Sequence, residues 1–136
     1  MKISSVLTSG LMVMLSLTFT ASANDKGVVL VTGANRGLGL EFVQQLEAKG
    51  YEVIGTARSP QKATELNATG ARVEQLDVAD AASVAALAER LGDTPIDFLI
   101  NNAGMLNRAD STLDSLDFDA MERSFQVNSL GPLRVT

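Results

Sequence analysis

The segment from Thr32 to Gly39 holds the residue types best suited to binding a phosphate group. It reads Thr-Gly-Ala-Asn-Arg-Gly-Leu-Gly and joins an apolar run to an amphipathic helix pattern. Where a glycine-rich turn leads a strand into a helix, unpaired N–H groups and the positive end of the helix dipole face an anion. Glycine lets the backbone approach the ligand and adopt positive φ. The segment predicts a nucleotide site, and an ordinary glycine turn is the alternative.

The spacing of these glycines, together with three later motifs, identifies a family. The glycines stand at positions 33, 37 and 39, which is neither the G-x-G-x-x-G pattern nor a phosphate loop ending in Gly-Lys-Ser/Thr. Asp77-Val78, the run from Asn101 to Gly104, and Asn128 follow in order. From about Lys26 to Thr136 the chain resembles the short-chain dehydrogenase/reductase family. The residues of its glycine motif are most similar to those of the carbonyl-reductase-like members.

The resemblance implies a nicotinamide dinucleotide cofactor and names the residues that would bind it. Asp77 would accept a hydrogen bond from the adenine amino group, although Asp also suits an ordinary helix-initiating turn. The two Asn side chains at 101 and 102 would tie strand ends together and line the cofactor. The cofactor-binding set is Thr32, Gly33, Asn35, Arg36, Gly37, Leu38, Gly39, Arg58, Asp77, Val78, Asn101, Asn102, Ala103 and Gly104.

Two arginines favour NADP over NAD. A site for NAD usually carries Asp or Glu at the end of the second strand, to accept from the ribose 2′-hydroxyl. Here that strand ends in Thr56-Ala57-Arg58, without an acid. The guanidinium of Arg58 has the charge and fork geometry to hold a 2′-phosphate, and Arg36 provides a second guanidinium. Two solvated surface charges are the alternative.

Asn128 is the candidate catalytic residue. It continues an apolar stripe of Phe118, Met121 and Phe125, where a buried amide needs a partner. Pro132 follows four residues later and has no N–H, so the Asn128 carbonyl loses its usual helical donor. The resemblance implies that this carbonyl holds a water in a proton relay to a catalytic lysine. A proline-kinked structural helix is the alternative.

Strand and helix patterns alternate, which predicts an α/β Rossmann-type parallel sheet with flanking helices. With right-handed crossovers, its four strands would take the order 3-2-1-4, and the cofactor would lie across their carboxyl ends. The expected strands are 28–31, 51–57, 72–77 and 96–100. The expected helices start near the glycine turn, near Ser59, after Asp80 and near Asp117.

Residues 1–23 have the pattern of a secretory signal peptide, and 24–136 would form the N-terminal part of the dinucleotide-binding domain. Lys2 precedes an apolar stretch too short and too polar for a comfortable membrane span, and Ala21-Ser22-Ala23 is a cleavage pattern. The leader predicts an exported or periplasmic protein without a stable membrane span after cleavage. An uncleaved anchor, or a misassigned start codon and a cytoplasmic protein, is the alternative.

Composition narrows the chemistry further. The chain has 136 residues, a net charge of −5, no His and no Cys. The acidic balance argues against nucleic acid or an anionic membrane as partner, and the missing His and Cys remove the commonest zinc ligands, so we expect no metal. By resemblance, the substrate is a small carbonyl or alcohol compound and a homo-oligomer is possible.

The family's catalytic pair is absent from these residues. The resemblance implies a Tyr-x-x-x-Lys pair and a serine, but the sole tyrosine is Tyr51, with Gly55 four residues on. We therefore expect the N-terminal portion of an NADP-dependent oxidoreductase that transfers hydride between nicotinamide and a carbonyl or alcohol, truncated before its catalytic residues and inactive alone. A non-catalytic dinucleotide-binding module or an inactive fragment is the alternative.

Overall fold

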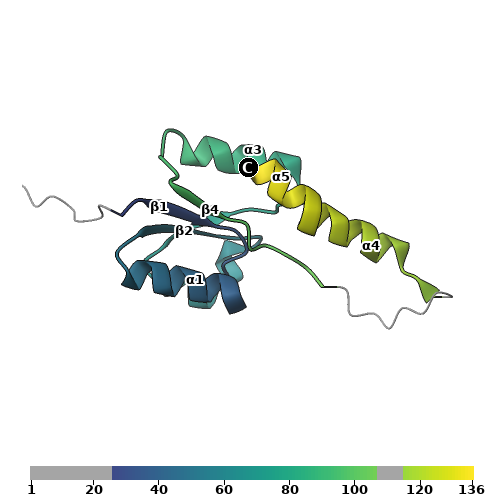
Figure 1. Ribbon diagram of the computed structural model, residues 1–136, viewed down its shortest axis with the longest axis horizontal. Coiled ribbons are helices and arrows are strands. Elements are labelled where there is room, and N and C mark those ends of the chain that lie inside the picture. The colour runs from purple at the N-terminus through teal and green to yellow at the C-terminus, as the bar shows by residue number, and fades with distance from the viewer. Residues whose placement is uncertain (1–25, 107–114) are drawn as a thin grey trace, which may run out of the picture.

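A four-stranded parallel sheet in the order β3-β2-β1-β4 forms the centre of the computed structural model (Figure 1). The structure describes residues 26–106 and 115–136, so the expected leader over residues 1–23 lies outside them. The predicted fold class and strand order are confirmed. The strands are β1 (Val28–Val31), β2 (Glu52–Ala57), β3 (Arg72–Gln75) and β4 (Phe98–Ile100).

Strand β1 has its expected bounds, whereas β2, β3 and β4 are shorter than the apolar patterns predict. Strand β3 ends at Gln75 rather than at Asp77, because after the Leu76 N–H bonds the Ala57 carbonyl the chain turns toward the next helix. All four residues of β1 are buried, as expected for a strand covered on both faces. In register, Val31 lies opposite Gly55 of β2 and Ile100 of β4, so the carboxyl ends of three strands meet at one edge.

Helices cover both faces of the sheet (Figure 1). On one face, α1 (Gly37–Ala48) and the short α2 (Thr64–Asn67) pack through Val43 and Leu66 against β1 and β2. On the other, α3 (Ala81–Leu91) packs through Leu87, and α5 (Gly131–Val135) adds Val135. The two apolar clusters hold helices against both faces of the sheet, and the candidate site lies at one edge of this packed sheet.

Local sequence signals set most of the helix ends. Asp80 caps α3 by accepting from the Ala82 N–H, and Gly92 follows the helix with φ of +54°. The prediction of one helix starting near Ser59 is wrong. The chain forms a 3₁₀ turn, η1 (Pro60–Lys62), leaves helical geometry at Ala63, and only then forms α2.

The last helical region has three parts. It runs through α4 (Phe118–Phe125), a π-helical turn η3 (Gln126–Leu130) and α5. The wider turn ends two residues before Pro132, which cannot donate the hydrogen bond that a regular α-helix requires there. The Asp117 side chain accepts from the Ala120 N–H and caps α4, which starts next to Asp117 as expected.

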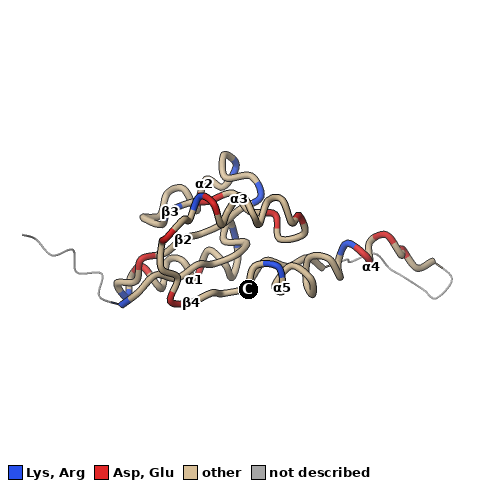
Figure 2. Tube along the Cα trace, turned by 90° about the horizontal axis from the view of Figure 1, so that it is seen from above, with Lys and Arg blue, Asp and Glu red and all other residues tan. Residues whose placement is uncertain are grey.

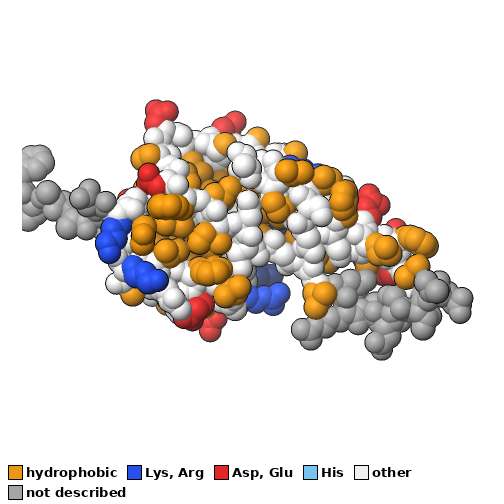
Figure 3. Space-filling model, viewed as in Figure 1, with side chains coloured by type: hydrophobic (Ala, Val, Ile, Leu, Met, Phe, Trp, Pro, Cys, Tyr) orange, Lys and Arg blue, Asp and Glu red, His pale blue; other side chains and the backbone are white. Residues whose placement is uncertain are grey.

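The expected burial of the α4 apolar stripe is wrong. Phe118, Met121 and Phe125 are 70%, 52% and 56% exposed, because α4 extends away from the sheet (Figures 1 and 2). Apolar side chains also gather near β4, where Phe98 is exposed, as the space-filling view shows (Figure 3). Within residues 26–106 and 115–136, no helix is long and apolar enough to cross a membrane.

Candidate functional site

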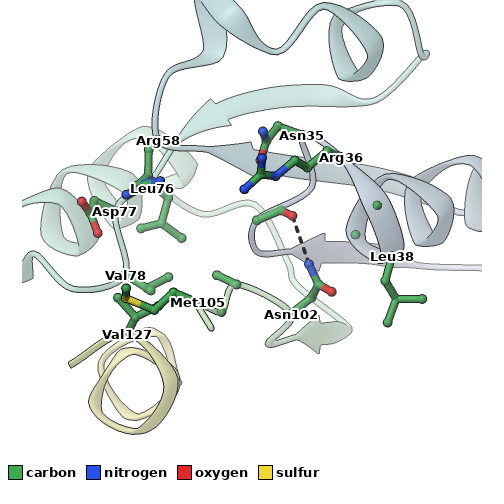
Figure 4. Close-up of a pocket in the computed structure, with 15 residues that line it drawn as sticks. Asn35, Arg36, Leu38, Arg58, Leu76, Asp77, Val78, Asn102, Met105 and Val127 are labelled. Atoms are coloured by element: carbon green, nitrogen blue, oxygen red, sulfur yellow. Dashed lines mark hydrogen bonds between the residues drawn. The ribbon is translucent and has the colours of Figure 1, made fainter. Parts of the chain in front are cut away.

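A cavity of about 430 Å³ opens at the carboxyl ends of β1, β2 and β4 (Figure 4). This is the edge of the sheet at which open parallel sheets bind ligands. Most of the residues predicted from the sequence meet here. Those lining the cavity are Gly33, Asn35, Arg36, Gly37, Leu38, Gly39, Arg58, Asp77, Val78, Asn102, Ala103 and Gly104.

The glycine turn presents an anion-binding surface to this cavity. Gly33 and Gly37 have φ of +64° and +55°, values that only glycine adopts readily. Arg36 is the extended N-cap residue of α1, its side chain caps nothing, and the first helical turn has no acidic residue. The N–H groups and the dipole of a twelve-residue helix are therefore left for an anion in the cavity.

Thr32 is predicted as a cofactor contact, but it lies fully buried behind the turn and does not line the cavity. Its Oγ1 accepts hydrogen bonds from the N–H groups of Asn102, at 3.0 Å, and Ala103, at 2.9 Å. The same hydroxyl lies 3.4 Å from the Ile100 carbonyl oxygen, to which it donates. Thr32 thus joins the turn after β1 to the segment after β4. Its hydroxyl can do so because it donates one hydrogen bond and accepts others at the same time.

The two asparagines after β4 differ. Asn102 Nδ2 donates to the carbonyls of Thr32, at 2.9 Å, and Gly33, at 3.0 Å, and so holds the turn against β4 (Figure 4). Asn101 is exposed and does not line the cavity, which corrects its assignment beside Asn102. Successive residues of extended chain point to opposite sides, so only one of the two can face the turn.

The two arginines lie on one side of the cavity. Figure 4 shows Asn35, Arg36 and Arg58 opposite Val78, Met105 and Val127. Both guanidinium groups are on exposed residues, and no described acid pairs with either within 4.0 Å. They give this side of the cavity two positive charges that are free to meet an anion.

The loop from Leu76 to Ala79 forms the wall beside Arg58. The Asp77 carboxylate accepts from the Ala79 N–H at 3.0 Å, so it stays at the cavity as part of a local turn. The Asp77 N–H donates to the Ser83 hydroxyl of α3 at 2.9 Å. Two hydrogen bonds therefore fix the orientation of an acid that can accept from a ligand.

Asn128 is brought to the site through its side chain. Its Nδ2 donates to the Met105 carbonyl and its Oδ1 accepts from the Met105 N–H, both at 2.8 Å. Asn128 does not line the cavity itself, and it is exposed rather than on the buried stripe that the pattern predicts. The amide satisfies its hydrogen bonds by holding the chain next to Gly104.

Three lining residues escaped sequence reasoning: Leu76, Met105 and Val127. Each is the immediate neighbour of a predicted residue, so extending each motif by one position would have found them. Met105 and Val127 also border a second cavity of about 450 Å³, whose other wall carries Asp119, Glu122 and Arg123 of α4. The first cavity therefore continues toward α4.

The family model described as short chain dehydrogenase matches residues 27–136. The chain belongs to the short-chain dehydrogenase family. Galactitol 2-dehydrogenase of Agrobacterium fabrum is 34% identical over 116 residues, which are 81% of this chain and 44% of the relative. The (-)-isopiperitenone reductase of Mentha piperita is 43% identical over 88 residues, 56% of this chain and 28% of the relative.

Solved structures of this family share the fold. A putative short-chain dehydrogenase/reductase from Burkholderia multivorans, solved with bound NADP, aligns with a TM-score of 0.71 and 29% identity over 80% of this chain and 50% of that one. The chain spans less than half the length of the two curated relatives above. The chain therefore belongs to a family of oxidoreductases.

Proposed function

We propose that the cavity binds NADP(H) and serves an oxidoreductase that transfers hydride between the nicotinamide and a carbonyl or alcohol carbon. One observation carries this: Arg36 and Arg58, which pair with no acid among the described residues, share a cavity with the uncapped N-terminus of α1. An anionic ligand with phosphates at two separate places fits that charge arrangement. The NADP bound to the Burkholderia multivorans relative supports the same choice.

The lining residues fit the parts of such a cofactor. A Cβ at Gly37 would meet nothing within 4 Å, so the turn is open toward the cavity and leaves room for a pyrophosphate against its N–H groups. Asp77 is the one acid that lines the first cavity, and it would accept from the adenine amino group. Arg36 and Arg58 would hold the 2′-phosphate, while Asn102, Ala103 and Gly104 would lie along the dinucleotide.

The reduced cofactor supplies the hydride, and other residues of the whole protein would handle the proton. Since the 136 residues hold no Tyr-x-x-x-Lys, we expect this chain to bind cofactor without turning over substrate. In the whole enzyme, the main-chain carbonyl of Asn128 would hold a water of the proton relay. The carbonyl or alcohol substrate, and any homo-oligomer, belong to this proposal as well.

Titration of the purified chain with NADPH, followed by cofactor fluorescence, tests the proposal. We expect saturable binding, with NADH weaker by about tenfold or more, since one charge-assisted hydrogen bond contributes about 1.5–3 kcal/mol. An equal or tighter response to NADH would contradict the roles given to the arginines. No response to either cofactor would refute the proposal as a whole.

Substitution of the arginines separates a specific contact from general charge. Arg58→Gln and Arg36→Gln should each weaken NADPH binding while leaving NADH binding nearly unchanged, because only NADPH carries the 2′-phosphate. Lys62→Gln is the matched control, since Lys62 carries the same charge on the nearby η1 and does not line the cavity. A loss of NADPH affinity in the control equal to that of Arg58→Gln would point to charge alone.

We also propose export by the N-terminal leader. Mass spectrometry of the mature protein tests this: a first residue of Asn24 indicates cleavage after Ala23, and a retained leader would favour an anchor or a cytoplasmic protein.

A further inference from the structure

Arg134 joins two parts of the cavity wall that are far apart in the sequence. Its Nη2 lies 2.6 Å from Gln126 Oε1, and its Nη1 lies 3.3 Å from the Gln126 carbonyl oxygen and 3.5 Å from that of Val78. Val78 belongs to the loop that carries Asp77, and Gln126 begins the π-helical turn that carries Val127. One guanidinium therefore binds the two segments that carry Val78 and Val127, which both line the cavity.

The acceptors of Arg134 are all neutral. Among the residues that the structure describes, Arg134 makes no ion pair, and its residue is only partly exposed. The short bond to Gln126 Oε1 is charge-assisted and fixes the guanidinium, which then reaches the two backbone carbonyls over longer distances. The planar fork of arginine can reach both sites at once, whereas a lysine offers a single nitrogen.

Packing brings the same two parts close together. A Cβ built on Gly131 would lie 2.8 Å from Val78 Cγ2, so helix α5 lies directly against the Val78 side chain. Ser83 holds the Asp77 N–H from the α3 side, while Arg134 holds the Val78 carbonyl from the α5 side. The loop is thus held from two helices, and Val78 stays buried against the cavity.

From this geometry we propose that Arg134 is a positioning residue for the adenosine half of the cofactor. It acts through Val78 and Val127, which line the cavity, and does not line the cavity itself. The inference rests on the proposed binding of NADP(H). It predicts that loss of the guanidinium weakens binding of any ligand that carries the adenosine half.

Binding of NADPH and of 2′,5′-ADP, the adenosine half alone, tests the proposal. Arg134→Met should weaken both by the same factor, about tenfold, as expected for loss of a charge-assisted hydrogen bond. Arg134→Lys should lose less, because it keeps the charge and a single donor nitrogen. Gln126→Met should also weaken both ligands, and Gln126→Glu, which keeps an acceptor for Arg134, should restore binding.

Arg72→Met is the matched control. Arg72 also donates to a backbone carbonyl, that of Arg90 at 2.9 Å, and to a side-chain oxygen of Glu74, but it does not line the cavity or contact its walls. This variant should bind both ligands like the parent chain. Unchanged binding in Arg134→Met, or an equal loss in Arg72→Met, would overturn the inference. If the parent chain binds neither ligand, the proposed function itself is wrong; should Arg134→Met not fold, the Gln126 pair decides.

Discussion

The side chain of Asn128 pairs with the backbone of Met105 through two hydrogen bonds, each 2.8 Å long. The amide carries a donor and an acceptor on separate atoms, so it can donate to the carbonyl and accept from the N–H of the same residue. The pair connects the π-helical turn to the segment after β4, whose Gly104 and Met105 line the cavity. The side chain thus has a structural task that is separate from the catalytic task proposed for the main-chain carbonyl.

Replacing Asn128 by Leu should detach Met105 from the helix and weaken NADPH binding. Each lost hydrogen bond contributes about 0.5–1.5 kcal/mol, so the free energy of unfolding should fall by about 1–3 kcal/mol. The free energy of unfolding of Asn128→Asp should lie between those of the parent chain and Asn128→Leu. Its carboxylate can accept from the Met105 N–H, but it has no proton to donate to the Met105 carbonyl. Urea unfolding and cofactor titration measure the effects, and Ser129→Ala, on the same turn, should change neither.

Thr32→Val should destabilise the protein although it preserves side-chain shape. The Ala103 N–H, bound at 2.9 Å, would lose its acceptor, while the Asn102 N–H also has the Ile100 carbonyl at 3.0 Å. One unsatisfied N–H costs about 1–3 kcal/mol. Thr32→Ser keeps the hydroxyl and should cost about 1 kcal/mol for the missing methyl group. A Ser variant less stable than Val would show that packing, not hydrogen bonding, fixes this position.

Most of the fold could be predicted because local and periodic signals agree with it. The buried run Val28–Val31, the Asp80 cap and the stop at Gly92 act within a few residues, and the topology follows from right-handed crossovers. What escaped prediction depends on tertiary contacts. The stripe of Phe118 and Met121 has a buried pattern, yet whether a helix face is covered depends on what packs against it.

The candidate site divides in the same way. Motif spacing places Gly33, Arg58 and Asp77 correctly at one sheet edge, because parallel strands deliver their carboxyl ends there. Spacing does not say which way a side chain points. Asn102 holds the turn while Asn101 does not line the cavity. The contact of Arg134 with Val78 bridges 56 residues that no local pattern relates.

The glycines of the turn should respond differently to alanine. Gly37→Ala should cost about 1–2 kcal/mol for positive φ and otherwise fold normally, because nothing lies within 4 Å of the added methyl group. That methyl group would occupy cavity space, so NADPH binding should fall strongly. At Gly39 the methyl group would collide with Asn102 Nδ2 and the Gly33 carbonyl, which themselves form a hydrogen bond. Gly39→Ala should therefore show the larger loss in thermal unfolding; a stable Gly39→Ala would contradict the packing described here.

Glu74 should make the free energy of unfolding depend on pH. Burial raises its pKa, but hydrogen bonds and charge from Arg90 and Arg72 outweigh burial and hold the pKa below its ordinary value of 4.5. A folded pKa below the unfolded one adds stability that is complete above the unfolded pKa and disappears as pH falls through the folded one. Glu74→Gln should thus lower the free energy of unfolding at pH 7 by about 1 kcal/mol or less, the range for partly exposed pairs.

The difference between Glu74→Gln and the parent chain should shrink toward zero in urea unfolding below the folded pKa, because both side chains are then uncharged. High salt at pH 7 should also reduce it, since screening weakens charges that are partly exposed. Glu65→Gln, which removes an exposed acid on α2, is the control and should leave the free energy of unfolding at pH 7 nearly unchanged. A Glu74 effect that is equally large in acid would mean that the two arginines bind this side chain through geometry rather than through its charge.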